Sequence, residues 1–199
     1  MFTCAIIDSV KIRKISSIKR GQWLVKPVLA GSMQLWLINN GSLTTRLQKR
    51  YMHFLVKPIS IKYAKPIANE ATVLGMARYE KVLIREVLLM GDDKAVVFAH
   101  SILPRASLRG AWNGLGRQGN IPLGATLFAN KKVKRSQLSY KKLPRHHPIS
   151  MRLAKHMQLL PAPLWARRSI FVLNCAKIMV TEVFLPQLLS SVIAAKVEI

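Results

Sequence analysis

Acidic side chains are scarce in this sequence. Its 199 residues include 8 Asp and Glu against 32 Lys and Arg, which gives a formal net charge of +24 at pH 7. Half of the residues are hydrophobic, which excludes a disordered polycation and suits one domain with a hydrophobic core. The charge predicts attraction to anions, whether nucleic acid, an acidic lipid surface or a small polycarboxylate.

Cysteines and long apolar runs are also scarce. Cys4 and Cys175 lie far apart, without histidines at metal-binding spacing, so we expect no disulfide scaffold and no metal site. The N-terminal segment is a poor signal peptide because its positive charge follows the apolar run. The most apolar region, 169–195, is interrupted by two charged residues and a proline, whereas a membrane-spanning helix needs about 20 apolar residues. We therefore expect a cytoplasmic protein.

The basic residues form two clusters, one near the N-terminus and one within 131–145, and the others are scattered. A nucleic-acid-binding protein usually concentrates its charge and adds aromatic side chains for stacking. Few aromatics accompany these clusters, with Tyr140 beside the second. A solvated basic surface accounts for this distribution, so we expect no specific nucleic-acid partner. A weak association with anionic membrane surfaces stays open.

Two antiparallel hairpins are the clearest local pattern. In 81–104, two β-rich runs flank the turn residues 91–93, and 164–186 repeats such an arrangement. An antiparallel sheet with helices gathered on one side, in a single α+β domain, is the expected architecture. The other expected elements are strands at 56–66 and 133–143 and a helix at 43–51 capped by Ser42.

Two charged residues interrupt apolar strands of these hairpins. Alternation places Arg85 on one face with Val87 and Leu89, and Glu182 on one face with Val180. Burying an unpaired charge is costly, so each needs a partner or a ligand. They can form an ion pair across neighbouring strands, or meet water where the sheet curves. They can also line a cavity, where Arg85 grips a ligand carboxylate and Glu182 holds a hydroxyl or moves a proton.

The histidines and glycines offer no further catalytic pattern. No Ser-His-Asp or HExxH spacing occurs, the histidines outside the loop at 146–147 are dispersed, and we expect the loop histidines to lie on a solvated surface. The glycines within 110–124 lack the spacing of a phosphate-binding loop. No nucleotide or metal is therefore assigned.

Five segments between about Leu35 and Pro186 carry a family resemblance. They are WLINNGSLTTRL, VLIREVLLMGDDKAVVFAHSILP, LGRQGNIPLGATLF, LWARRSIF and IMVTEVFLP. In this order and spacing, the sequence resembles the chorismate–pyruvate lyase family, the bacterial enzymes that make 4-hydroxybenzoate for ubiquinone. Each segment is weak alone, and the five in register are specific.

The resemblance implies a monomeric α+β fold on a six-stranded antiparallel sheet, with an internal ligand cavity beneath two flaps and no cofactor. The family's carboxylate-binding arginine in R-E-[IV]-L-L falls on Arg85, and the glutamate of T-E-[LV]-F-L-P falls on Glu182. The flap position of S-M-T falls on Leu43, and the leucine of P-L-G falls on Leu123.

Some positions depart from the family pattern. Leu43 replaces a methionine, Ala166 replaces a frequent glycine before two arginines, and His100 replaces a frequent arginine. Outside the resemblance, we expect a basic N-terminal extension over 1–20 and a C-terminal tail over 187–199, so that 21–186 forms the domain.

The implied activity is the conversion of chorismate to 4-hydroxybenzoate and pyruvate, the first committed step of ubiquinone synthesis. Arg85 would hold the ring carboxylate, Glu182 the ring hydroxyl, and Leu43 and Leu123 would cover the ring. Two alternatives remain. One is a non-catalytic domain of the same fold that binds a small aromatic or carboxylate ligand, as in the effector domains of bacterial transcription regulators. The other is a basic nucleic-acid-binding protein.

Overall fold

The computed structural model describes residues 22–117, 121–157 and 162–190. The expected basic extension over 1–20 and the part of the expected tail after Ser190 lie outside the described residues. Within those ranges, no helix is long and apolar enough to cross a membrane.

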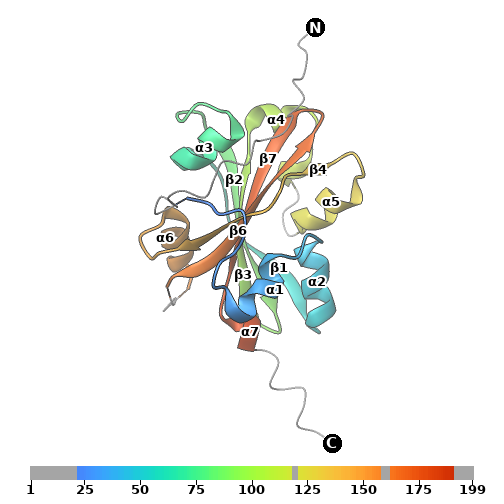
Figure 1. Ribbon diagram of the computed structural model, residues 1–199. Helices are drawn as coiled ribbons and strands as arrows, with labels where there is room; N and C mark the ends of the chain where they lie inside the picture. Colours follow the sequence, from blue (N-terminus) through green and yellow to red (C-terminus); the bar gives the residue numbers. More distant parts are fainter. Residues whose placement is uncertain (1–21, 118–120, 158–161, 191–199) are drawn as a thin grey trace, which may run out of the picture.

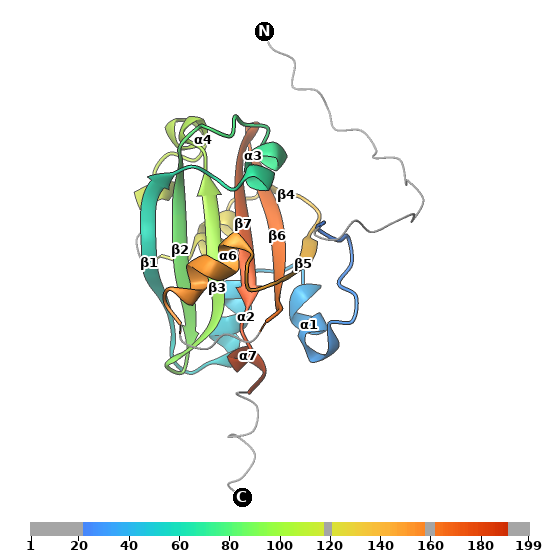
Figure 2. The same ribbon diagram turned by 90° about the vertical axis from the view of Figure 1, so that its left-hand side faces the viewer.

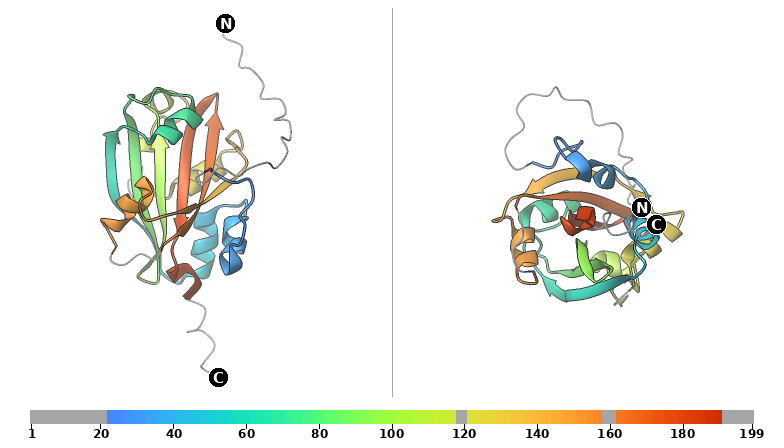
Figure 3. Two further views of the ribbon diagram at one scale, coloured as in Figure 1. Left: turned by 60° about the vertical axis from the view of Figure 1, so that its left-hand side comes forward. Right: turned by 90° about the horizontal axis from the view of Figure 1, so that it is seen from below.

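A single antiparallel sheet forms the centre of the molecule, which confirms the predicted α+β class. The strands run in the order β1-β2-β3-β7-β6-β4, and β5 also pairs with β6. Figure 3 (left) shows β1, β2, β3, β7 and β6 side by side. The bounds are β1 (Phe54–Ala64), β2 (Val82–Gly91), β3 (Lys94–Leu103), β4 (Lys134–Arg135), β5 (Ser139–Leu143), β6 (Leu164–Leu173) and β7 (Ala176–Phe184).

The strand expected at 133–143 is divided into β4 and β5. Between them, the Ser136 N–H donates to the Ile170 carbonyl, and the Ser136 hydroxyl accepts from the Ile170 N–H. The side chain thus takes the place of a backbone carbonyl, and the regular ladder stops there. The six strand positions implied by the resemblance therefore hold seven strands, because β4 and β5 share one edge.

Helices cover both faces of the sheet, not one as the sequence led us to expect. Figure 1 views the sheet nearly edge-on, with α3 and α6 on one side and α2 and α5 on the other, and Figure 2 places α3 and α6 in front of the strands. The reason is that β2 and β3 are buried along almost their whole length, so both faces need cover. The helices are α1 (Gln34–Leu37), α2 (Leu43–Arg50), α3 (Ala68–Leu74), α4 (Arg105–Arg109), α5 (Leu123–Ala129), α6 (Pro148–Ala154) and α7 (Gln187–Ser190), with 3₁₀ turns at Gly31–Met33 and Leu115–Arg117.

A two-residue turn sets the register of the second hairpin. Asn174 and Cys175 have positive φ values of 47° and 65°, the conformation that tight β-hairpin turns require. With this turn, Arg167 of β6 lies directly opposite Glu182 of β7. The register brings a cation next to the acid that interrupts the apolar strand.

Candidate active site

A cavity lies between the sheet and the helices α2 and α5. Its walls are mainly apolar, and they include the rings of Phe128 and Phe171. Apolar walls with a few convergent polar groups are typical of small-molecule sites. The polar residues of the wall are Thr44, Arg85, Ser101, Arg135, Ser169 and Glu182.

The four residues singled out from the sequence all line this cavity: Leu43, Arg85, Leu123 and Glu182. Arg85 and Glu182 belong to strands that are separated by β3, so they do not lie on neighbouring strands. Glu182 pairs with Ala99, which in turn pairs with Val87, two residues from Arg85. With strands about 4.8 Å apart and a rise of about 3.3 Å per residue, their backbones are roughly 12 Å apart. The two side chains therefore enter the cavity from separate points on the sheet.

Arg85 is almost fully buried, with 2 % of its surface exposed. Its Nη2 donates a hydrogen bond of 3.0 Å to the carbonyl oxygen of Ile121, in the segment that leads into α5. Burial lowers the pKa of Arg85, but an arginine begins so far above neutrality that it stays charged. The site therefore holds a desolvated guanidinium that also contacts the segment in front of a covering helix.

Glu182 finds its partner in Arg167, which sequence reasoning missed. Arg167 Nε lies 2.5 Å from Glu182 Oε2, and the arginine side chain is 1 % exposed while the glutamate side chain is 14 % exposed. Since a buried charge is costly without a partner, this pair accounts for an acid inside an apolar strand. Glu182 therefore forms an ion pair across neighbouring strands, which was one of the alternatives from the sequence. Its partner is Arg167 and not Arg85.

Arg167 also anchors the segment that connects α1 to α2. Its Nη1 lies within hydrogen-bonding distance of the carbonyl oxygens of Trp36, Leu37 and Asn39, at 3.2, 3.4 and 2.7 Å. These carbonyls lie at the end of a short helix, where backbone acceptors lack helical partners. One guanidinium thus joins the sheet, Glu182 and the segment leading to Leu43.

Arg135 is a second cation in the cavity wall, and it too was missed. Its guanidinium carbon lies 5.3 Å from the ring centroids of Phe128 and Phe171, and its Nη1 donates to the Asn40 carbonyl at 2.9 Å. Burial lowers the pKa of Arg135, and the charge of Glu182 acts in the opposite direction. Its place in a short edge strand of polar residues gave no sequence signal.

The helices α2 and α5 meet above the cavity. The Ser42 side chain accepts from the Thr45 N–H, so the predicted N-cap of α2 is confirmed and Leu43 begins the helix. A Cβ atom on Gly124 of α5 would lie 2.8 Å from Thr44 Oγ1, so glycine is needed for the helices to approach this closely. Leu43 and Leu123, each nearly fully buried, are the first residues of the two helices.

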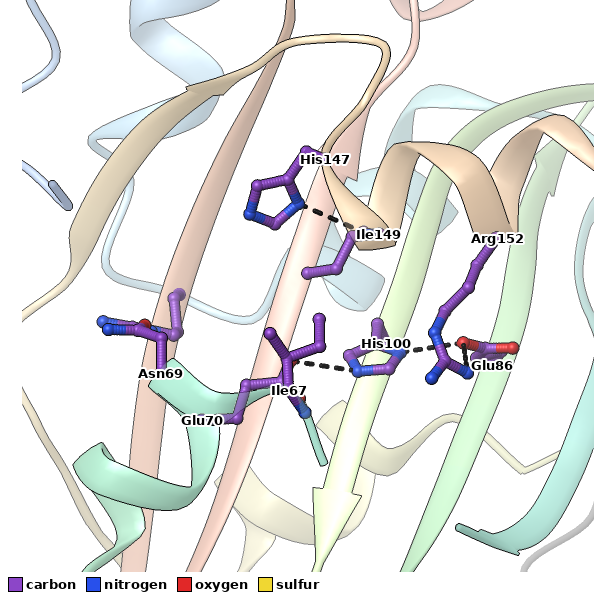
Figure 4. Close-up of polar contacts among 9 residues, drawn as sticks. Ile67, Asn69, Glu70, Glu86, His100, His147, Ile149 and Arg152 are labelled. Carbon is purple, nitrogen blue, oxygen red and sulfur yellow. Dashed lines mark hydrogen bonds and ion pairs between the residues drawn. The ribbon is translucent and has the colours of Figure 1, made fainter. Parts of the chain in front are cut away.

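A second buried polar cluster lies on the opposite face of the sheet (Figure 4). His100 Nδ1 is 2.9 Å from Glu86 Oε1, and His100 Nε2 is 3.1 Å from Glu70 Oε1. Arg152 of α6 is 3.3 Å from the same Glu86 oxygen. Glu70 belongs to α3, so this cluster fastens α3 and α6 to the sheet. Figure 3 (right) shows α6 on the side away from α2 and α5.

His100, to which no role was assigned from the sequence, is fully buried. Burial by itself lowers the pKa of His100, but the adjacent carboxylates of Glu70 and Glu86 raise it to about 8. Burial raises the pKa of Glu86, yet its hydrogen bond to His100 and the charges of His100 and Arg152 bring it below the usual value. The two carboxylates therefore favour the protonated form of the imidazole that lies between them.

The sequence of this chain is similar to a known family over most of its length. Residues 20–194 match the family model described as chorismate lyase. A protein of Thiobacillus denitrificans, described as "Probable chorismate pyruvate-lyase", is 46 % identical over 78 % of this chain and 83 % of its own. A protein of Nitrosomonas europaea with the same description is 47 % identical over 82 % of this chain and 93 % of its own.

Solved structures share the fold at low sequence identity. The PhnF C-terminal domain has a TM-score of 0.51 at 16 % identity and covers 70 % of this chain and 87 % of its own. PhnF from Mycobacterium smegmatis has a TM-score of 0.51 at 16 % identity, over 75 % of this chain and 66 % of its own. Similarity at this level concerns the architecture alone.

The buried histidine predicts a pH dependence of stability. Since the folded-state pKa of His100 is raised from 6.5 to about 8, its stabilising contribution is fully present below pH 6.5 and is lost as the pH rises through 8. This shift corresponds to about 2 kcal/mol. We expect the free energy of unfolding in urea to fall by about that amount between pH 6 and 9.

His100→Gln is the matched control for this titration, because glutamine keeps polar atoms in the cluster but does not titrate. Its unfolding free energy should be lower at pH 6 and should change much less up to pH 9. Equal slopes for both proteins would contradict a protonated His100 in the folded state.

Proposed function

This chain belongs to the chorismate lyase family, and from that premise we propose that it converts chorismate to 4-hydroxybenzoate and pyruvate. This is the first committed step of ubiquinone synthesis. The observation that carries the proposal is one cavity lined by a buried arginine, a glutamate and two covering leucines. These are the groups that a small aromatic carboxylate with a hydroxyl at the opposite end of its ring would need.

The reaction is an elimination that makes the ring aromatic. The ring C–O bond to the enolpyruvyl ether breaks, and its electron pair leaves with the ether oxygen. The hydrogen on the adjacent ring carbon, which bears the hydroxyl, is lost as a proton, and enolpyruvate takes up a proton to become pyruvate. Because aromatisation supplies the driving force, the protein contributes positioning, charge stabilisation and exclusion of water.

Arg85 would hold the ring carboxylate through charge-assisted hydrogen bonds. A guanidinium suits a carboxylate because two parallel N–H groups match its two oxygens. The burial of Arg85 strengthens the attraction, since water screens it less. Because Arg85 also donates to the Ile121 carbonyl, binding of the carboxylate would be coupled to the position of the segment that leads into α5.

Glu182 would accept a hydrogen bond from the ring hydroxyl. Its Oε2 already accepts from Arg167, so Oε1 is the oxygen we assign to the substrate. Arg167 orients the carboxylate, and a carboxylate at this position can also receive the proton lost from the neighbouring ring carbon. Leu43 and Leu123 would close over the ring and make product release slow.

A non-catalytic binding protein of the same fold is the alternative that the architecture keeps open, given its likeness to the PhnF C-terminal domain. Incubation of the purified protein with chorismate separates the two. A lyase releases 4-hydroxybenzoate and pyruvate in equal amounts, whereas a binding protein gives a calorimetric signal without products.

We further propose that the enzyme acts as a cytoplasmic monomer, as the family resemblance implies.

Replacement of Arg85 tests the carboxylate clamp. Arg85→Met keeps an unbranched side chain and removes the charged guanidinium. We expect kcat/KM for chorismate to fall at least about 100-fold, because a buried charged hydrogen-bonding partner typically contributes 2–5 kcal/mol or more. Arg145→Met, at an exposed position, is the control and should retain wild-type activity. A folded Arg85→Met protein of normal activity would refute the clamp.

Replacement of Glu182 tests the hydroxyl contact. Glu182→Gln keeps the shape and one acceptor oxygen near Arg167, so thermal unfolding should show a folded protein. We expect turnover to drop by about 100-fold or more, the usual size of a lost acid–base or orienting group. Loss of activity only through unfolding would return Glu182 to a purely structural role.

The contact between the two covering helices gives a third prediction. Gly124→Ala would force α5 away from Thr44, and overpacking typically costs about 1–3 kcal/mol. We expect the inhibition constant of 4-hydroxybenzoate to rise at least about fivefold, because the closed state is disfavoured. Adding Thr44→Ala to this variant removes the nearest atom and should recover part of the affinity. An unchanged inhibition constant in Gly124→Ala would mean that closure does not involve this contact.

A further inference from the structure

We propose that Arg135 binds the second carboxylate of the substrate, the one on the enolpyruvyl group. This inference rests on the proposed function and extends it. The cavity would then hold a separate cation for each end of a dianion, with Arg85 for the carboxylate that stays on the product and Arg135 for the carboxylate that leaves.

The position of the Arg135 guanidinium supports this assignment. It donates to the Asn40 carbonyl, while Arg167 donates to the preceding Asn39 carbonyl, so the two guanidinium groups lie beside each other. Arg167 in turn pairs with Glu182. Arg135 therefore lies at the Glu182 end of the cavity, where its charge and that of Glu182 interact.

The chemistry of chorismate places its second carboxylate at this same end. The enolpyruvyl ether is attached to the ring carbon next to the one bearing the hydroxyl. If Glu182 holds the hydroxyl, the ether and its carboxylate extend from the adjacent carbon. A cation near Glu182 is therefore within reach of the leaving group, and Arg85 is at the opposite end of the ring.

Arg135 also has an unused hydrogen-bond donor. Its Nε is buried and, among the described residues, has no hydrogen-bond acceptor. A buried donor without a partner is costly, and in a binding site it often marks the place of a ligand atom. The rings of Phe128 and Phe171 contact each other edge to face, and both lie 5.3 Å from the guanidinium carbon, so they restrict its orientation before a ligand binds.

The charges in the wall are consistent with a dianionic ligand. Arg85 and Arg135 face one acid, Glu182, which is already paired with Arg167. During the elimination, negative charge develops on the ether oxygen, close to the carboxylate that Arg135 would hold. Arg135 would thus contribute to substrate binding and also stabilise the leaving enolpyruvate.

A different role for Arg135 is to secure the α1–α2 segment through Asn40, without touching the substrate. The two roles predict different responses to the product. 4-Hydroxybenzoate has the ring carboxylate and the hydroxyl but lacks the enolpyruvyl carboxylate. A carboxylate-binding Arg135 matters for chorismate alone, whereas a segment anchor matters for both ligands.

The experiment compares Arg135→Gln with wild type for chorismate turnover and for competitive inhibition by 4-hydroxybenzoate. We expect kcat/KM for chorismate to fall about 30-fold or more, a loss typical of a buried charged contact. The inhibition constant of 4-hydroxybenzoate should stay within about threefold of wild type, because its contacts are intact. Arg135→Lys, which keeps the charge, should recover part of the chorismate activity.

Arg46→Gln is the matched control for the anchoring role. Arg46 donates to the Leu35 carbonyl at 2.7 Å in the same segment and is not among the residues lining the cavity. Its loss should affect both ligands little and equally. If Arg135→Gln weakens 4-hydroxybenzoate as much as chorismate, or leaves chorismate turnover unchanged, the second carboxylate site is refuted.

The proposed function can fail separately from this inference. If wild-type protein binds chorismate without turnover, the lyase assignment fails, and the same comparison is made with dissociation constants. Weaker binding of chorismate, but not of 4-hydroxybenzoate, by Arg135→Gln would still support the second site. Binding of neither compound by wild type would overturn both.

Discussion

The ion pair between Arg167 and Glu182 is the interaction on which the site depends. It crosses the hairpin of β6 and β7 and continues through Arg167 Nη1 into the carbonyls of Trp36, Leu37 and Asn39. Because Arg167 is fully buried, water competes little for its guanidinium in these bonds. The carboxylate that faces the cavity and the segment that leads into α2 are therefore held by one side chain.

Strand alternation explains how the same sheet carries two unrelated polar sites. In β2, Arg85 points to the cavity, and the next residue, Glu86, points to the opposite face. In β3, Ser101 lines the cavity while His100 contacts Glu86. The cluster on the opposite face attaches α3 and α6 to the sheet through ion pairs. These contacts stabilise the strands behind the cavity without involving α2 and α5, the helices that cover it.

The sequence predicted the elements and the cavity residues better than their partners. Hairpins and the capped helix at Leu43 depend on local patterns, and those were correct. The Arg167–Glu182 pair follows from the register of the hairpin, which the two-residue turn at Asn174 and Cys175 fixes. The sequence did not locate that turn, because its position depends on the backbone conformation of these two residues. The contacts of His100 involve α3, and those of Arg135 involve the segment around Asn40. Both partners are distant in sequence, so no spacing pattern predicts these contacts.

The segment from Leu35 to Asn40 explains part of the basic composition. Arg46, Arg167 and Arg135 donate to its carbonyl oxygens, so cations satisfy acceptors at the end of α1, where a helix leaves its last carbonyls without intrahelical partners. Arg167 is also paired with the Glu182 carboxylate, but the acceptors that Arg46 and Arg135 contact here are neutral and do not cancel the charge of these two side chains. A segment fastened in this way leaves positive potential beside the cavity. The same contacts that order the approach to α2 thereby favour a ligand with two negative charges.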